Sequence, residues 1–464
     1  MAEIISVIKR QLHPDKKTAA CLDDQSRKCN FLYNYLLERA NQYKDEFKKT
    51  GNPEYAQIIY NKRGLRDLVP GIKGDYPYLK SVYAAPLKNT ALRLSDAITA
   101  YQNSHKGKRK GKKIKWPRFR SFKQSWFSLL YDEPYKGYVV RDNKLIISLG
   151  MGTDRKRHSL TIALSAGHML KGKQVRNLRI VKNNGIFSAV FTVLCTVPET
   201  KPIKNIIALD PNHKNLAYGV DNQGIALEIQ APSWLKVYDR RLDELAALLS
   251  NCKKKSRLVT YVDHTGSTRE VWEPSRRFAK LKTVYTRLLA QRRELTKSFC
   301  YRIANLLFKQ HDLVAIGDYT PHGQGITTAM RRAMNNRSLI GRFKEIAAWI
   351  AIKSGKTYQE FDERGTTRTC HACRFIVPEG IAPHIRHWTC PGCSIEHIRD
   401  ENAACNGLLK VLNNQEKESR SNSALVPGSG RVQVKERRAW RVLSSGAIVY
   451  CGDKTIVESI TPRN

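Results

Sequence analysis

The spacing of apolar residues predicts a strand at the start of the chain, followed by helices. Apolar and polar residues alternate over residues 4–12, and Pro14 with Asp15 ends this strand. Over residues 23–47, apolar residues recur three and four positions apart, which predicts an amphipathic helix. A second helix is expected over residues 85–101.

Strand-like patterns return in the middle of the chain. Residues 138–150, 158–165 and 187–197 are rich in β-branched and aromatic residues and together predict an antiparallel sheet. Residues 201–205 indicate a linker into a new domain. We therefore expect a domain boundary close to residue 200.

The second half begins with a buried strand that ends in an acidic residue. The apolar run 206–212 contains Asp210, and the shorter strands 216–220 and 225–229 follow it with a turn between them. The RNase H-like fold begins with three strands in this order, and a carboxylate leaving its first strand is its usual metal ligand. Taken alone, Asp210 is also compatible with an Asp-Pro turn that has no chemical role.

Two more apolar runs end in acidic residues. Residues 312–318 end at Asp318, and residues 357–363 end at Glu363. Apolar residues three and four apart predict helices before and between these runs, over residues 234–249, 278–299 and 338–354. We interpret these helices as core or paired helices, not as a cofactor site.

Between Glu363 and Asp400 lie two Cys-x-x-Cys pairs. The spacing C-x2-C-x16-C-x2-C is typical of one tetrahedral zinc ion, and its ligands would be Cys370, Cys373, Cys390 and Cys393. Because four protein ligands leave no open position for chemistry, we expect a structural zinc ribbon. Glu363 precedes the first cysteine by seven residues and Asp400 follows the last by seven, so folding the ribbon out as an insertion can bring these carboxylates together.

Four carboxylates are thus expected at strand ends or at a helix start: Asp210, Asp318, Glu363 and Asp400. Phosphodiester hydrolysis by two magnesium ions needs about three hard oxygen ligands that hold the ions about 4 Å apart. Asp210, one strand-end acid and Asp400 would supply them.

The composition favours an intracellular protein with a polyanionic partner. The 464 residues carry 81 basic and 41 acidic side chains, a formal charge of +40 that nucleic acid would neutralise. A membrane surface or an acidic protein is the alternative partner. No run of about 20 apolar residues and no signal segment is found, so we expect neither membrane insertion nor secretion. Seven of the eleven cysteines are scattered, which indicates reduced thiols in a cytoplasmic or nucleoid-associated protein.

Residues 105–126 combine basic residues with Trp116 and other aromatic residues. Cations for phosphates and aromatic faces for bases are what a nucleic-acid groove needs. The candidate contacts are Lys108, Arg109, Lys112, Lys113, Lys115, Trp116, Arg118 and Arg120. The alternative is a solvated basic loop whose aromatic residues anchor it to the core.

Several segments together resemble the TnpB family, transposon-encoded RNA-guided nucleases related to the type V CRISPR effectors. The matching segments are KRQLHP, CNFLYNYLLE, KGKKIKWPRFRS, IIALDPN, RELTKSFCYRIANLLF with VAIGD, the four-cysteine ribbon and HIRDENAACN. They cover roughly residues 5 to 410. The ribbon and the last segment, with their spacing, are the most specific.

The chain departs from the family pattern at one acid. Most TnpB proteins carry a Glu at the end of the strand that reads VAIGD here, where this chain has Asp318. The Fanzor-like branch instead carries a Glu before the ribbon in a pattern resembling E-x-x-T-x-K/R-T-C, and the segment from Glu363 to Cys370 is similar to it. Since neighbouring strands lie about 4.8 Å apart, a Glu on the adjacent strand can reach the same metal. The resemblance thus implies catalytic Asp210, Glu363 and Asp400, with Asp318 as a secondary acid; the rival assignment makes Asp318 the second acid.

The resemblance implies an α/β multidomain protein. An RNase H-like (RuvC) nuclease domain with an inserted zinc ribbon would follow a wedge β-barrel that contains a helical recognition insert. The implied parts are the wedge barrel at 1–19 and 106–200, the helical insert at 20–105, the RuvC domain at 201–363 and 397–412, the target nucleic-acid-binding ribbon at 364–396, and a flexible tail at 413–464.

The implied activity is RNA-guided cleavage of double-stranded DNA beside a short adjacent motif. The protein would be a monomer bound to one guide RNA from the transposon end, with two Mg²⁺ ions and one structural Zn²⁺. Two alternatives stay open: a nuclease-inactive RNA-guided repressor, and a DNA transposase.

Overall fold

The computed structural model describes residues 3–109, 111–121, 127–152, 154–200, 202–212, 215–262, 268–318, 338–382, 384–421, 432–442 and 448–452. The chain divides into two compact units, with the boundary between Thr196 and Val197. Each unit is described by itself.

The N-terminal unit contains a seven-stranded antiparallel sheet with β1 (Glu3–His13) at its centre. The strand order is β2-β6-β7-β1-β5-β4-β3. β1 pairs with β7 along nearly its whole length and with β5 at its end, so the first strand of the chain joins strands more than 140 residues away. The other strands are β2 (Phe127–Tyr131), β3 (Tyr138–Arg141), β4 (Lys144–Met151), β5 (Arg157–Leu164), β6 (Val175–Asn183) and β7 (Ile186–Thr196).

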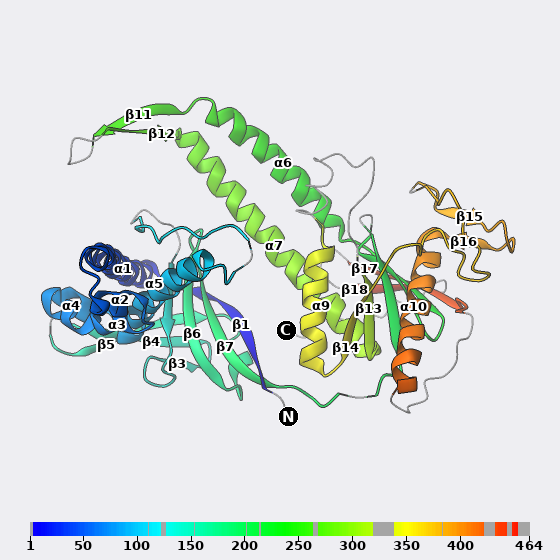
Figure 1. Ribbon diagram of the computed structural model, residues 1–464, viewed down its shortest axis with the longest axis horizontal. Coiled ribbons are helices and arrows are strands. Elements are labelled where there is room, and N and C mark those ends of the chain that lie inside the picture. The colour runs from blue at the N-terminus through cyan, green and yellow to red at the C-terminus, as the bar shows by residue number, and fades with distance from the viewer. Residues whose placement is uncertain are drawn as a thin grey trace. The chain divides into compact units, whose positions relative to one another are not determined.

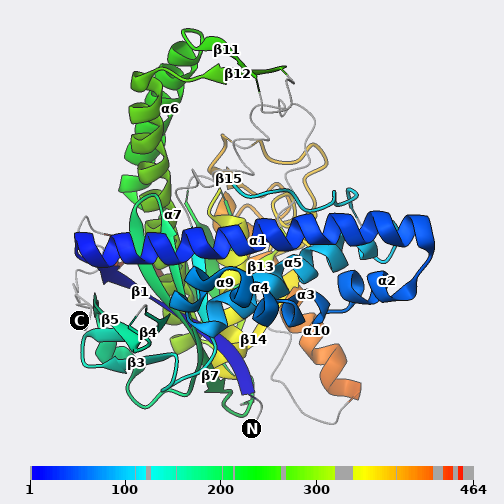
Figure 2. The same ribbon diagram turned by 90° about the vertical axis from the view of Figure 1, so that its left-hand side faces the viewer.

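The helices of this unit lie between β1 and β2 in the chain. The long helix α1 (Lys16–Thr50) starts at Asp15, whose side chain accepts a hydrogen bond from the Thr18 N–H at 2.7 Å, and it ends at Gly51 with φ of 69°. Figure 2 shows α1 lying along the shorter helices. These are α2 (Pro53–Tyr60), α3 (Gly64–Asp67), α4 (Val69–Asp75), the 3-10 helix Pro77–Ser81 and α5 (Ala84–His105). One continuous apolar core joins the helices to the sheet.

The C-terminal unit is built on a second seven-stranded sheet, of order β14-β13-β8-β9-β10-β17-β18. β8 is antiparallel to β9 and parallel to β13, and β13 is parallel to β14. Gly317 of β13 pairs with Phe361 of β14, which confirms the expectation that the strands leading to Asp318 and Glu363 are neighbours. The strands are β8 (Ile206–Pro211), β9 (Ala217–Asp221), β10 (Ile225–Ile229), β13 (Leu313–Gly317), β14 (Thr357–Phe361), β17 (Glu436–Val442) and β18 (Ile448–Gly452).

Helices cover both faces of this sheet (Figure 1). Alternate strand residues such as Ile207 and Ile316 pack against α7 (Arg276–Gln310) and α9 (Ile340–Ser354). The intervening residues, such as Ile206 and Ala315, pack against α10 (Arg399–Ser421) on the other face. Strands buried on both faces explain the continuous apolar runs in the sequence.

A long helical arm follows β10. α6 (Ser233–Lys253) and α7 lie side by side, and at their far end the chain forms a hairpin of β11 (Arg257–Val262) and β12 (Thr268–Glu273), as Figure 1 shows. Arg292 of α7 binds Asp239 of α6 at 2.6 Å, which ties the two helices together.

The expectation of a flexible tail from residue 413 is wrong for much of that segment. α10 continues to Ser421, and β17 adds to the sheet in parallel with β10. Trp440 of β17 is 1% exposed within the core under α7, so burial of this large ring holds the segment in place. The charged residues within β17 concealed this strand in the sequence. β18 pairs with β17 in an antiparallel arrangement.

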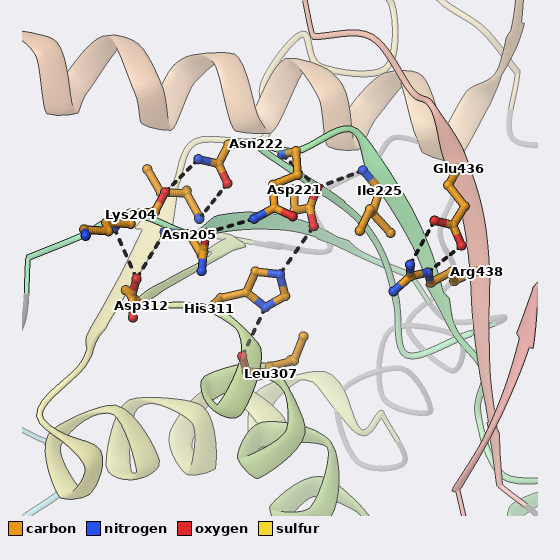
Figure 3. A network of polar contacts seen from close by, with 12 residues as sticks. Lys204, Asn205, Asp221, Asn222, Ile225, Leu307, His311, Asp312, Glu436 and Arg438 are labelled. Atoms are coloured by element: carbon orange, nitrogen blue, oxygen red, sulfur yellow. Dashed lines mark hydrogen bonds and ion pairs between the residues drawn. The ribbon is translucent and has the colours of Figure 1, made fainter. Parts of the chain in front are cut away.

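A polar network fixes the amino-terminal ends of β8 and β13 (Figure 3). His311 approaches the Asp221 carboxylate at 3.6 Å, and Asp312 accepts hydrogen bonds from the backbone N–H groups of Lys204 and Asn205. Asp210 lies at the opposite, carboxyl end of β8. Within the described residues, no helix combines the length and apolar character needed to cross a bilayer.

Candidate metal centres

Asp210 stands at the carboxyl end of the central strand β8, close to two other acids. Part of the residue reaches solvent, but protein atoms enclose its carboxyl group. Burial raises the pKa of Asp210 well above its usual value, and the negative charges of Glu363 and Asp400 raise it further, against a smaller opposite effect of Arg399. The structure therefore brings together three of the four acids expected from the sequence.

Glu363 reaches this cluster from the segment just after β14, the strand next to β13. Its side chain lies over Gly317, where an added Cβ would lie 2.0 Å from the Glu363 Oε1 atom and 2.5 Å from Cγ. The absence of a side chain at position 317 leaves the space that the Glu363 carboxylate occupies. Sequence reasoning noticed the acid that follows this glycine but not the role of the glycine.

Asp318 is exposed and acts on the backbone of Glu363. Its Oδ1 atom accepts a hydrogen bond from the Glu363 N–H at 3.2 Å, and its own N–H donates to the Phe361 carbonyl at 2.8 Å. Lys344 donates to the Asp318 carbonyl at 3.0 Å. This arrangement favours Asp318 as a hydrogen-bonding neighbour over Asp318 as the second acid.

Asp400 lies in the first turn of α10, where a carboxylate also interacts favourably with the helix dipole. Arg386 of the cysteine ribbon donates to both carboxylate oxygens, at 2.9 and 3.1 Å. The next residue, Glu401, is 6% exposed and accepts hydrogen bonds from Tyr218 at 3.0 Å and Arg437 at 2.8 Å. The start of α10 is thus held by β9, β17 and the ribbon.

The acid cluster has the donor set of a magnesium site. Carboxylate oxygens are the hard ligands that Mg²⁺ prefers. Burial, and then the negative charges of Glu363 and Asp400, raise the pKa of Asp210; a divalent cation would offset both effects, so these carboxylates fit the ion.

The four cysteines converge as the sequence predicts. The ligand atoms of Cys370, Cys373, Cys390 and Cys393 all lie within 4.8 Å of one another. Two of the Sγ–Sγ distances are 3.8 Å (Cys370–Cys393) and 3.6 Å (Cys373–Cys390). A tetrahedron with Zn–S bonds of about 2.3 Å has edges of about 3.8 Å, so the site fits zinc. A short hairpin of β15 (His387–Thr389) and β16 (Glu396–Ile398) supports the second pair of cysteines.

The basic segment is anchored by its tryptophan. Trp116 Nε1 donates to Asn41 at 2.8 Å, its ring contacts Tyr101 edge-on, and the Lys44 ammonium lies 4.0 Å from its centre. Arg120 is partly buried with its guanidinium 3.5 Å over the ring of Tyr33. These contacts favour the anchoring interpretation for Trp116 and Arg120.

The other basic candidates are on the surface. The exposed side chains are Lys108, Arg109, Lys112, Lys113, Lys115 and Arg118. Phe119 is exposed as well, whereas Phe122 and Trp126 lie outside the described residues.

Comparison with known families gives a match at the ribbon. Residues 341–407 match the family described as "Cas12f1-like, TNB domain". This range contains Glu363, the four cysteines and Asp400. Two relatives from Mycobacterium tuberculosis, "Putative RNA-guided DNA endonuclease MT2953" (strain CDC 1551 / Oshkosh) and "Putative RNA-guided DNA endonuclease Rv2885c" (strain ATCC 25618 / H37Rv), are each 26% identical over 320 residues. The chain is related to the TnpB and type V effector proteins.

The extent of these matches is limited. The alignment spans 67% of this TnpB-related chain and 65% of the length of each M. tuberculosis relative. Among solved structures, the Cas12f1–sgRNA–target DNA complex aligns with a TM-score of 0.49 at 11% identity, over 87% of this chain and 98% of that one. CasPhi-2 (Cas12j) bound to crRNA aligns with a TM-score of 0.34 at 11% identity, over 88% and 98%.

Proposed function

We propose that the chain is an RNA-guided DNA endonuclease whose nuclease centre consists of Asp210, Glu363 and Asp400. The observation that carries the proposal is the convergence of these three carboxylates at the carboxyl end of β8, with the pKa of Asp210 raised by burial and by the other two acids. The names of the M. tuberculosis relatives support the same activity.

In this proposal the C-terminal unit is a RuvC-type nuclease. The order β10-β9-β8-β13-β14, with only the first three strands antiparallel, supports an RNase H-like sheet. The N-terminal unit would be the wedge barrel with its helical insert, bound to a guide RNA from the transposon end and to a short motif beside the double-stranded DNA target. The exposed lysine and arginine side chains of residues 108–118 would contact nucleic-acid phosphates.

The three acids would hold two magnesium ions through their carboxylate oxygens. Bound magnesium would supply the Lewis acidity that activates water and steadies the leaving oxygen in phosphodiester hydrolysis. Asp210 must be ionised to act, so protons compete with the metal for its carboxylate. Arg386, which pairs with Asp400 at 2.9 Å, would balance the charge of that carboxylate when no metal is bound.

The test is cleavage of a plasmid that carries a guide-matched target. Protein co-expressed with the DNA flanking its gene is assayed in Mg²⁺, with and without RNase treatment. We expect RNA-dependent cleavage that Glu363→Ala abolishes and Asp318→Ala only weakens. If Asp318→Ala alone abolishes cleavage, the rival acid assignment is correct and the activity stands.

The assay also separates the alternative functions. Target binding without cleavage in Mg²⁺ would identify a nuclease-inactive repressor. Cleavage and joining that need no RNA would identify a transposase.

A further inference from the structure

One face of α10 is polar and points at the segment that follows β14. Asn402, Asn406 and Lys410 recur four residues apart and so share one face of the helix. Ala404 and Leu408, on another face, pack against the sheet. Asn402 and Asn406 are only 1% and 3% exposed, and amides this buried are expected to have hydrogen-bond partners.

Asn402 binds the backbone of the loop that leads into and just past Cys370. Its Nδ2 atom donates to the carbonyls of Thr366, Thr367 and Thr369 at 3.3, 3.4 and 2.8 Å. Its Oδ1 atom accepts from the His371 N–H at 2.9 Å.

Asn406 repeats this pattern one turn later. Its Nδ2 atom donates to the carbonyls of Thr366 and Thr369 at 2.9 and 2.6 Å. Its Oδ1 atom accepts from Arg374, which follows Cys373 in the ribbon, at 3.1 Å. Both amides therefore act as donors to carbonyls on one side and as acceptors from the ribbon on the other.

Two sets of hydrogen bonds link this polar face of α10 to the backbone at Glu363. The N–H and hydroxyl of Thr366 both donate to the Glu363 carbonyl, at 3.1 and 2.8 Å. Lys410 donates to the carbonyls of Asp362 and Arg364, both at 2.8 Å, and so binds the residues on either side of Glu363.

We propose that Asn402, Asn406 and Lys410 are positioning residues for the Glu363 carboxylate. They would make the placement of that acid depend on α10, the helix that itself carries Asp400, and on the ribbon loop. The inference rests on the proposed function and deepens it: α10 sets the distance between two metal-binding acids. Outer contacts of this kind typically change metal affinity roughly 10- to 100-fold.

The competing explanation is that these residues only stabilise the fold, and isosteric variants separate the two. Asn402→Asp and Asn406→Asp keep the acceptor oxygen and the shape but replace the donor NH₂ with an oxygen that faces carbonyls. Asn413→Asp makes the same charge change at an exposed position of the same helix and is the matched control. Lys410→Met leaves both asparagines and the ribbon contacts intact.

The full chain, freed of nucleic acid, is titrated with Mn²⁺ and followed by electron paramagnetic resonance, with zinc content and Tm measured on each sample. We expect Mn²⁺ affinity to fall at least tenfold in Asn406→Asp and Lys410→Met, with one zinc ion per chain retained, and to stay unchanged in Asn413→Asp. If an asparagine variant loses zinc or unfolds, Lys410→Met decides.

Wild-type Mn²⁺ affinity in folded, zinc-containing Asn406→Asp or Lys410→Met would overturn the inference. Asp210→Ala distinguishes this failure from failure of the proposed function. If Asp210→Ala binds Mn²⁺ as tightly as the wild type, the acid cluster is not the metal centre and the proposed function itself is wrong.

Discussion

Gly317→Ala is expected to inactivate the proposed nuclease centre while leaving the fold intact. An alanine Cβ would lie 2.0 Å from the Glu363 Oε1 atom and 2.6 Å from Cδ. Ordinary contacts begin at 3.4 Å, so the oxygen would have to move by about the difference, 1.4 Å. Mg²⁺ demands near-ideal octahedral geometry at about 2.0–2.1 Å, and a 1 Å misplacement in an active site can reduce the rate about 100-fold. A loss of that size corresponds to about 2.7 kcal/mol of activation free energy.

The assay is the rate of plasmid cleavage under single-turnover conditions, with Tm measured in parallel. The backbone at Gly317 does not have the positive φ that an alanine would resist, so Tm should change little. Gly341→Ala is the matched control, because a Cβ there meets nothing within 4 Å. Cleavage by Gly317→Ala at the wild-type rate would refute the argument that an empty position 317 makes room for Glu363.

Three further outcomes follow from the same geometry. Asp318→Asn keeps the acceptor for the Glu363 N–H and should cut within a few-fold of wild type, and a complete loss would instead make the Asp318 carboxylate a metal ligand. Cys373→Ser should lower bound zinc from one ion per chain towards none by elemental analysis, whereas Cys252→Ser, outside the ribbon, should retain it; equal zinc in both would contradict the four-cysteine site. Because the pKa of Asp210 is raised in the fold, ionising it costs stability as pH rises above its unfolded value of 3.8, and this cost is complete above its folded pKa. Asp210→Asn removes the cost of the buried charge and its repulsion by the other acids, so it should raise Tm at pH 7 without magnesium, by roughly 2–4 °C per kcal/mol removed; a lowered Tm would show that the carboxylate is not under strain.

The convergence of the four cysteines, and of three acids, was the most predictable part of the molecule. The cysteine spacing alone predicts the four converging thiols, because two turns of Cys-x-x-Cys leave little freedom. The acids could be placed because parallel β-strands bring their carboxyl ends to one edge of the sheet. β8, β13 and β14 are parallel neighbours, so Asp210 and the residues that end the other two strands had to lie close together.

Contacts that depend on shape were not predictable. Gly317 leaves space for the Glu363 side chain, and a single sequence does not show which glycine has such a role. Asn402 and Asn406 are spaced four apart on α10, and that spacing was a usable signal that went unused. β17 was missed because its charged residues, such as Arg437 and Arg438, obscure the apolar contribution of Trp440. Trp116 was ambiguous in the sequence, since an aromatic ring among lysines is equally suited to stacking and to anchoring, and its contacts in the structure favour anchoring.

The pairing of β10 with β17 determines the order in which the two units can fold during translation. The N-terminal unit is continuous from Glu3 to Thr196 and has its own core, so it can fold as soon as it emerges. The second sheet is incomplete until Trp440 has been synthesised, more than 200 residues after its partner strand. A chain released early would therefore keep its first unit but lack the strand whose Arg437 supports the start of α10. Synthesis itself would thus separate the acquisition of a folded N-terminal unit from the completion of the proposed nuclease centre.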